Sequence, residues 1–145
     1  MPVTPTWREQ YDRMQRWYTR LSEPMTDDER RLDDFYAFPV CCYHLNDWLK
    51  ADSYLDSEIT DQVETYVATN LWLGLCADLA NASKHAQVNR TPRYDSMARV
   101  LKDTFHDRIV VTLNGQTWFA TDVAKKFLAA WDTFLTLRGL IPGRP

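Results

Sequence analysis

The sequence predicts a mainly α fold: a single-domain bundle of about five helices, with a C-terminal two-stranded hairpin before the last helix. Apolar and aromatic residues recur every three or four positions over most of the 145 residues, which is the period of amphipathic helices. One β-branched run ends in Asn114-Gly115, a strong hairpin signal. No repeat or linker divides the chain, so we expect residues 1–145 to share one core.

The first helix is expected over residues 6–22, ending before Pro24. Its apolar stripe comprises Trp7, Tyr11, Met14, Tyr18 and Leu21. Its arginines, interleaved with aromatic residues that include Trp17, are Arg8, Arg13, Arg16 and Arg20. This pattern is typical of a surface that binds a phosphate backbone and stacks bases, but also of a solvated arginine face over an aromatic core.

A second helix is expected from Asp27 towards Ala51. Thr26 and Glu29 match a capping box at its start, and Pro39 interrupts it near its midpoint, with a kink in the turn before. One apolar face comprises Leu32, Phe35, Phe38, Cys42, Leu45 and Leu49, and the next comprises Ala37, Val40, Cys41, His44 and Trp48. With two apolar faces, this helix is predicted to be the central, most buried one.

Three further elements complete the predicted fold. A short third helix is expected from Ser57 or Thr60 to about Ala68, and Asn70 caps a fourth over about 71–87. The hairpin is expected over about 108–119, and the last helix over about 121–138. The apolar stripe of the last helix comprises Val123, Phe127, Leu128, Trp131, Phe134 and Leu135.

The composition and net charge of the chain bear on which classes of protein it can belong to. The formal net charge of −3 is too small to indicate a nucleic-acid or membrane-binding protein by electrostatics alone. No apolar run approaches the ~20 residues that span a bilayer, and the N-terminus lacks a signal-peptide pattern. The three cysteines form no disulfide framework, and Cys76 is interpreted as a packed thiol. We therefore expect a cytoplasmic protein without a membrane partner.

Two motifs carry the polar residues of greatest interest. On the fourth helix, the polar positions that continue an apolar face through Leu71, Gly74 and Leu75 are Asp78, Asn81 and His85. On the second helix, His44, Asp47 and Trp48 lie within one turn. If these two helices pack together, the side chains form one buried His/Asp/Asn patch, in which each polar group needs a partner or a role.

Three interpretations of this patch stay open: a divalent metal site, an acid/base site and a purely structural hydrogen-bonded cluster. The candidates are His44, Asp47, Asp78 and His85 as catalytic or metal-ligating residues, and Asn81, Ser83, Lys84 and Trp48 as ligand-binding residues. The Glu-x-x-His pairs of di-iron bundles are absent from the sequence. Lys84 near a helix C-terminus is also favoured by the helix dipole, whatever the function.

The H-L-x-D-W element at His44–Trp48 and the C-x-D-x-x-N-x-S-K-H element at Cys76–His85 resemble small uncharacterised bacterial and phage-borne helical proteins. The resemblance extends over 109–135, and it implies a phage or mobile-element origin but no particular reaction. A weaker likeness is to HEPN-type helical bundles, which act on RNA or bind nucleotides. Arg99 and His106 match the arginine–histidine spacing of that family, or else are a solvated helix residue and a residue leading into the hairpin.

Three functions follow from these observations. The first is an accessory protein that presents the patch to a nucleotide or RNA. The second is a metal-assisted or acid/base enzyme that acts on a small molecule. The third is a non-catalytic module that binds a protein or a second copy of itself through exposed aromatic residues, with Trp7, Trp17 and Trp118 as candidates.

Overall fold

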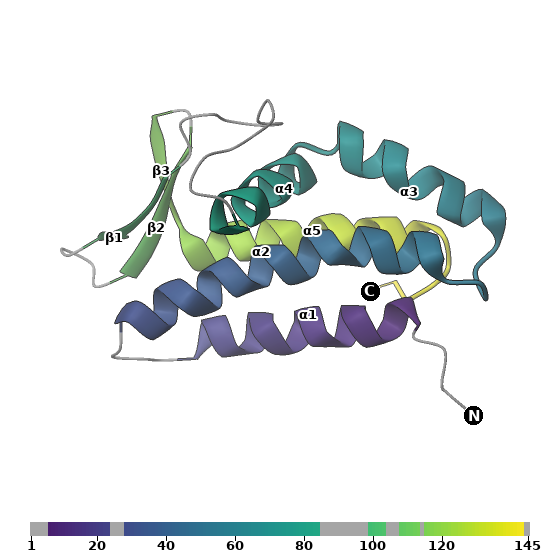
Figure 1. The fold of residues 1–145 in the computed structure, drawn as a ribbon, viewed down its shortest axis with the longest axis horizontal. Coiled ribbons are helices and arrows are strands. Elements are labelled where there is room, and N and C mark those ends of the chain that lie inside the picture. The colour runs from purple at the N-terminus through teal and green to yellow at the C-terminus, as the bar shows by residue number, and fades with distance from the viewer. Residues whose placement is uncertain (1–5, 24–27, 85–98, 104–107, 114, 144–145) are drawn as a thin grey trace.

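The computed structural model describes residues 6–23, 28–84, 99–103, 108–113 and 115–143. Its elements are α1 (Trp7–Ser22), α2 (Asp28–Ala51), α3 (Ser57–Thr69), α4 (Leu71–Lys84), β1 (Arg99–Asp103), β2 (Arg108–Leu113), β3 (Gln116–Phe119) and α5 (Ala120–Leu137). Helices dominate, and the β2–β3 hairpin leads into α5 (Figure 1). The predicted mainly α bundle of five helices, with a hairpin before the last helix, is confirmed.

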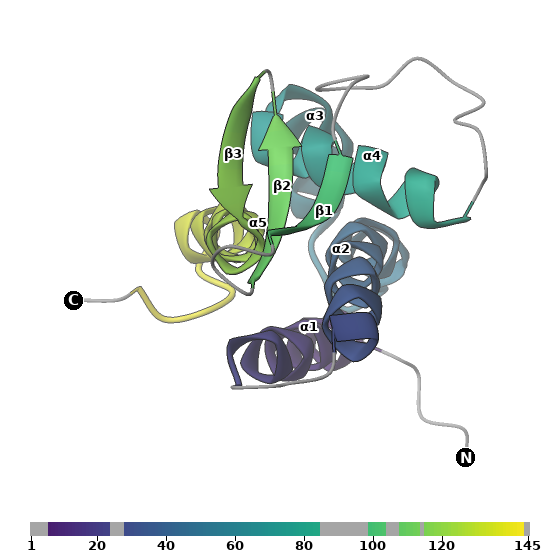
Figure 2. The ribbon, with the colours of Figure 1, turned by 90° about the vertical axis from the view of Figure 1, so that its left-hand side faces the viewer.

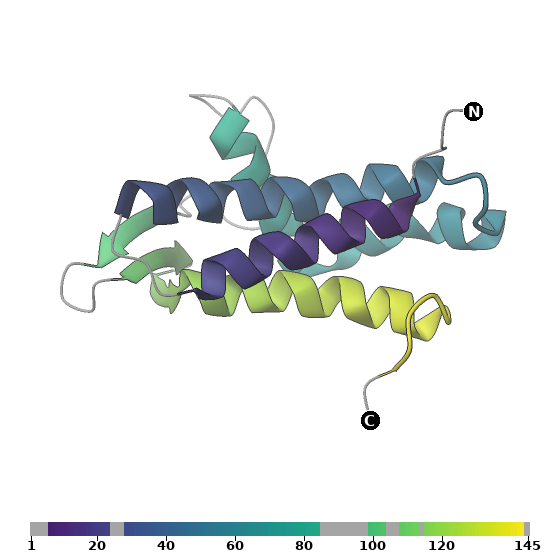
Figure 3. The same ribbon diagram turned by 90° about the horizontal axis from the view of Figure 1, so that it is seen from below.

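Three long helices form the body of the molecule. α1 and α2 run antiparallel (Figure 1), and α1 lies across the boundary between α2 and α5 when the molecule is seen from below (Figure 3). Seen from the end that carries the sheet, α4 crosses α2 on the side opposite α1 (Figure 2). The two faces of α2 are thus covered by different helices.

α2 is the central helix, as predicted, and it contacts α1, α3, α4 and α5. Its inner face is fully buried and comprises Phe35, Phe38, Cys42, Leu45 and Leu49. Main-chain carbonyls near its middle accept side-chain hydrogen bonds from three neighbours: Gln10 Nε2 of α1 to Cys41 O (2.9 Å), Cys76 Sγ of α4 to Pro39 O (3.2 Å) and Trp131 Nε1 of α5 to Cys42 O (2.8 Å). Each contact fixes one helix against α2.

The predictions for α2 are confirmed in part. The helix spans Asp28–Ala51, as expected, and Pro39 lies inside it without ending it. A proline in a helix costs about 3 kcal/mol, and here the burial of Pro39 and its neighbours between other helices offsets that cost. The second apolar face is less buried than expected, because His44 is exposed and Trp48 is only half buried.

The sheet has three strands in the order β1-β2-β3. The hairpin is confirmed: β2 and β3 pair antiparallel, and Gly115 in their turn has φ +78°, a conformation that favours glycine. β1 pairs antiparallel with β2, so the interpretation of Arg99 as a solvated helix residue is wrong. Pairing with β2 decides the conformation of this segment, because strand propensity depends strongly on neighbours.

The caps of the middle helices agree in part with the prediction. Asn70 Oδ1 accepts a hydrogen bond from the Leu73 N–H (3.1 Å), so Asn70 caps α4 as expected. α3 is capped instead by Asp56, whose side chain accepts from the Glu58 N–H (2.9 Å). The predicted end of the fourth helix near Gln87 and the capping box at Thr26 lie outside the described residues.

Candidate functional site

The two sequence motifs do not form one buried patch. On α2, His44 and Asp47 are exposed, and Asp47 lies 3.8 Å from the Lys50 Nζ in an ion pair. On α4, Asp78 is buried and Asn81 is half buried. The expectation of a shared buried patch is therefore wrong for His44 and Asp47, and these two residues do not join Asp78 in the interior.

Helical register explains this outcome. Asn46, which follows His44 by two residues, is 6% exposed and belongs to the inward side of α2. Two residues correspond to about 160° around the shorter side of a helix, so His44 points away from the interior. The pattern of polar residues in H-L-x-D-W gave no means of choosing which one faces inward.

The remaining candidates lie towards the end of α4. Ser83 and Lys84 form its last turn, within one turn of Asn81, and His85 lies outside the described residues. Within the described ranges, no group of three or more His, Cys, Asp and Glu residues is placed to hold a metal ion. The described residues therefore supply no metal centre, and Asp78 is the one predicted ligand that they bury.

A different set of residues gathers along α1 and the neighbouring side of α2. Arg13, Arg16 and Arg20 are three and four residues apart, so they share one side of α1. The Arg13 guanidinium lies over the Trp48 ring, 5.6 Å from its centroid. The Arg20 Nε donates a hydrogen bond to Asp34 Oδ2 at 2.9 Å. Because Trp48 and Asp34 both belong to α2, the arginine side of α1 borders α2 along its length.

A hollow of about 370 Å³ opens at the end of this side, where α1 leads towards α2. It is lined by Gln15, Arg16, Thr19, Arg20, Glu23 and Arg30. Three of these residues are arginines and one is a glutamate, so the lining has a local excess of positive charge. We call the surface formed by Arg13, Arg16, Trp17, Arg20, Arg30, His44 and Trp48 the arginine face.

Two arginines of this face, Arg13 and Arg20, are held in place by contacts with other side chains. Arg20 also lies over the Trp17 ring, 5.2 Å from its centroid, and its partner Asp34 is 5% exposed. Arg13 donates a hydrogen bond to the side chain of Gln10, which is itself buried. Guanidinium groups fixed above aromatic rings lose less side-chain entropy when they bind an anion. The chemistry of this face suits a ligand with phosphate groups and flat rings.

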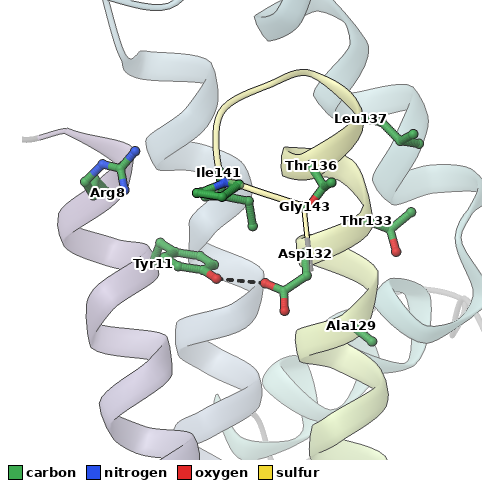
Figure 4. A pocket seen from close by; sticks show the side chains of 10 residues that line it. Arg8, Tyr11, Ala129, Asp132, Thr133, Thr136, Leu137, Ile141 and Gly143 are labelled. Carbon is green, nitrogen blue, oxygen red and sulfur yellow. Dashed lines mark hydrogen bonds between the residues drawn. The ribbon is translucent and has the colours of Figure 1, made fainter. Parts of the chain in front are cut away.

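A second concave surface, of about 690 Å³, lies between α1, α5 and the segment after α5. Tyr11 and Asp132 meet across it, with the Tyr11 hydroxyl donating to Asp132 Oδ1 at 2.8 Å (Figure 4). Arg8 lines its edge and donates to the Leu140 carbonyl at 3.1 Å. These contacts join α1 to α5 and to the segment that follows it, and they give the groove a structural role.

The cysteines are packed thiols, which agrees with the interpretation of Cys76. Cys42 and Cys76 are fully buried, and Cys41 is half buried. Burial, together with a hydrogen bond to Cys76, raises the pKa of the Cys42 thiol well above its usual range. Burial also raises the pKa of Cys41, against a lowering effect of Arg13. Thiols with raised pKa values are poor nucleophiles at neutral pH.

Sequence reasoning missed the acidic partner and the basic residue that complete the arginine face. Asp34 and Arg30 belong to α2, and no local pattern links them to α1. The spacing of Arg13, Arg16 and Arg20 was the available signal, and it marked the side of α1 that borders α2.

None of the helices in the described ranges combines the length and apolar character needed to cross a bilayer. Comparisons with protein-family models, with curated proteins and with solved structures gave no match to this chain. The function therefore has to be inferred from the residues and their arrangement.

Proposed function

We propose that this chain is a small cytoplasmic accessory protein of bacterial or phage origin that binds a nucleotide or RNA on the arginine face. The observation that carries the proposal is the hollow lined by Arg16, Arg20 and Arg30, beside the stacked pair of Arg20 and Trp17. Guanidinium groups bind phosphate oxygens with directed hydrogen bonds. The three free cysteines suit a reducing compartment.

The local charge of this face matters more than the net charge of −3. Electrostatic attraction between exposed charges is screened beyond about 8–10 Å at physiological salt. A ligand in the hollow therefore meets chiefly Arg16, Arg20, Arg30 and Glu23, together with the Asp34 carboxylate 2.9 Å from Arg20, rather than the more distant acidic residues. The pairing of Arg20 with buried Asp34 keeps its guanidinium on this face.

The test is a binding titration of a fluorescent nucleotide and a fluorescent RNA at several salt concentrations. We expect the variant Arg16→Gln/Arg30→Gln to weaken binding and, for single-stranded RNA, to lower the log–log salt slope by about 1.4, since each phosphate contact contributes about 0.7. Lys125→Gln/Lys126→Gln removes the same charge from exposed positions on α5 and is the matched control. Equal loss in both variants, or no loss in the arginine variant, would contradict the proposal.

A second candidate function is the protein-interaction module, favoured by an exposed apolar surface at the start of α4. Leu71 is 68% exposed, and its neighbour Trp72 meets Trp118 of β3 edge to face with ring centroids 5.5 Å apart. Trp7 does not belong to any such surface, because it is buried. The test is to measure the mass of the protein in solution at several concentrations. If the mass rises with concentration in the wild type but not in Leu71→Ser, this function becomes the first candidate.

A further inference from the structure

Arginine and tryptophan form a repeated unit on the arginine face. Arg13 lies over Trp48 at 5.6 Å, and Arg20 lies over Trp17 at 5.2 Å. Arg13 and Arg20 are seven residues apart on α1, which corresponds to about 10 Å along a helix. The hollow that holds Arg16 and Arg30 continues from the second of these units.

The rings of these units are accessible to a ligand at the cost of moving one side chain. Trp17 and Trp48 are each half buried, so their rings lie at the surface and pack against the core. An arginine over a ring covers the flat face that a nucleic-acid base would use. If a base takes that place, the displaced guanidinium is free to contact the phosphate beside it.

The anchors of both arginines survive such an exchange. Arg20 keeps Asp34 through its Nε, at 2.9 Å, which leaves its terminal nitrogens to turn outward. Arg13 is held by Gln10, whose own Nε2 is bound to the Cys41 carbonyl at 2.9 Å. Each unit therefore offers one stacking surface and one tethered guanidinium.

On the basis of the proposed function, we infer that the ligand is a single strand of nucleic acid rather than a mononucleotide or a duplex. Successive bases stack on Trp48 and Trp17, and the backbone follows Arg13, Arg16, Arg20 and Arg30. A mononucleotide supplies one base and fills one unit only. In a duplex the bases stack on each other, so their faces are closed to tryptophan.

This placement also gives a role to part of the H-L-x-D-W motif. Trp48 is the second stacking surface, and exposed His44 lies one turn away on the same side of α2. The motif thus serves the arginine face and not a site shared with Asp78.

The experiment uses the full chain with a twelve-nucleotide oligouridine, the matching oligodeoxyuridine, a twelve-base-pair duplex and ATP as competitor, followed by fluorescence anisotropy. We expect both single strands to bind at least about tenfold more tightly than the duplex, and ATP to compete only weakly. Trp48→Leu should weaken binding of the strands by about tenfold, since one base stack is lost. A difference between the two single strands shows which sugar the face prefers.

Trp118→Leu is the control, because Trp118 is also half buried but lies on β3, away from the arginine face. If Trp48→Leu does not fold, Trp48→Phe should bind nearly as wild type, and Arg13→Gln should bind more weakly. The inference is overturned if the duplex or ATP binds as tightly as the strands, or if Trp48→Leu binds as wild type. In those cases, weaker binding in Arg16→Gln/Arg30→Gln still supports the proposed function. If that variant binds as wild type, both the inference and the proposed function are contradicted.

Discussion

Asn46 is a residue at which the packed core leaves a polar atom without a partner among the described residues. Its side-chain Oδ1 is fully buried and accepts no hydrogen bond there. A buried acceptor without a donor costs about 1–3 kcal/mol. We expect Asn46→Leu, which has a similar shape and no polar atom, to raise the free energy of unfolding by about 1 kcal/mol in urea denaturation. A loss of stability would mean that Oδ1 has a partner after all.

Asn46 also shows how much of the site could be predicted from the sequence. The segment His44–Trp48 pointed to a candidate site on α2, but a helix with apolar residues on most sides does not reveal which polar residue is turned inward. Asn46 is buried, whereas His44 and Asp47 are exposed. The arginine side of α1 was predictable because its spacing is local, and Asp34 was not, because its role depends on how two helices pack.

Among the elements, α1 depends on a residue that follows a different helix. The first N–H groups of a helix have no partner within it, and Thr6 makes no capping bond with its side chain. Asp52 supplies one: its Oδ2 accepts from the Trp7 N–H (3.0 Å) and its Oδ1 from the Tyr54 N–H (2.9 Å). The carboxylate is 5% exposed, so water does not compete for these bonds.

We therefore expect Asp52→Ala to lower the free energy of unfolding by about 2–4 kcal/mol, because two charge-assisted hydrogen bonds are lost and two N–H groups lose their acceptor. Thermal and urea unfolding, followed by circular dichroism, measure this change. Asp56→Ala is the matched control: it removes a capping carboxylate that is exposed and local to α3, and should cost about 1 kcal/mol. Equal losses in the two variants would contradict the long-range role of Asp52.

The elements themselves were predictable where the signal is periodic or carried by a turn. α1, α3 and α5 follow from apolar stripes, and the β2–β3 hairpin follows from its Asn-Gly turn. β1 carries no such signal, since its strand conformation comes from pairing with β2. The continuity of α2 through Pro39 is likewise a tertiary effect, because helices pack against α2 on several sides.

For the whole molecule, the thiols in the core link stability to pH. Cys42 lies where α2 meets α4 and α5, it is fully buried, and its pKa is raised by burial and by a hydrogen bond to Cys76. The native state therefore keeps this proton at a pH where the unfolded chain has released it. Since the unfolded thiol ionises near pH 8.5, this contribution to stability is fully present below that pH and declines above it.

We expect the free energy of unfolding to fall between pH 8.5 and 10, with a slope that steepens towards about 1.4 kcal/mol per pH unit for each such thiol. Cys42→Ala should flatten this slope while lowering stability at every pH, because it removes the titrating group along with some packing. Val63→Ala, at another fully buried position, should lower stability equally at every pH and leave the slope unchanged. Urea denaturation at pH 7.5, 8.5, 9.25 and 10 compares the three chains. Parallel curves for wild type and Cys42→Ala would show that the Cys42 proton is not retained by the fold, and would remove the link between this core and pH.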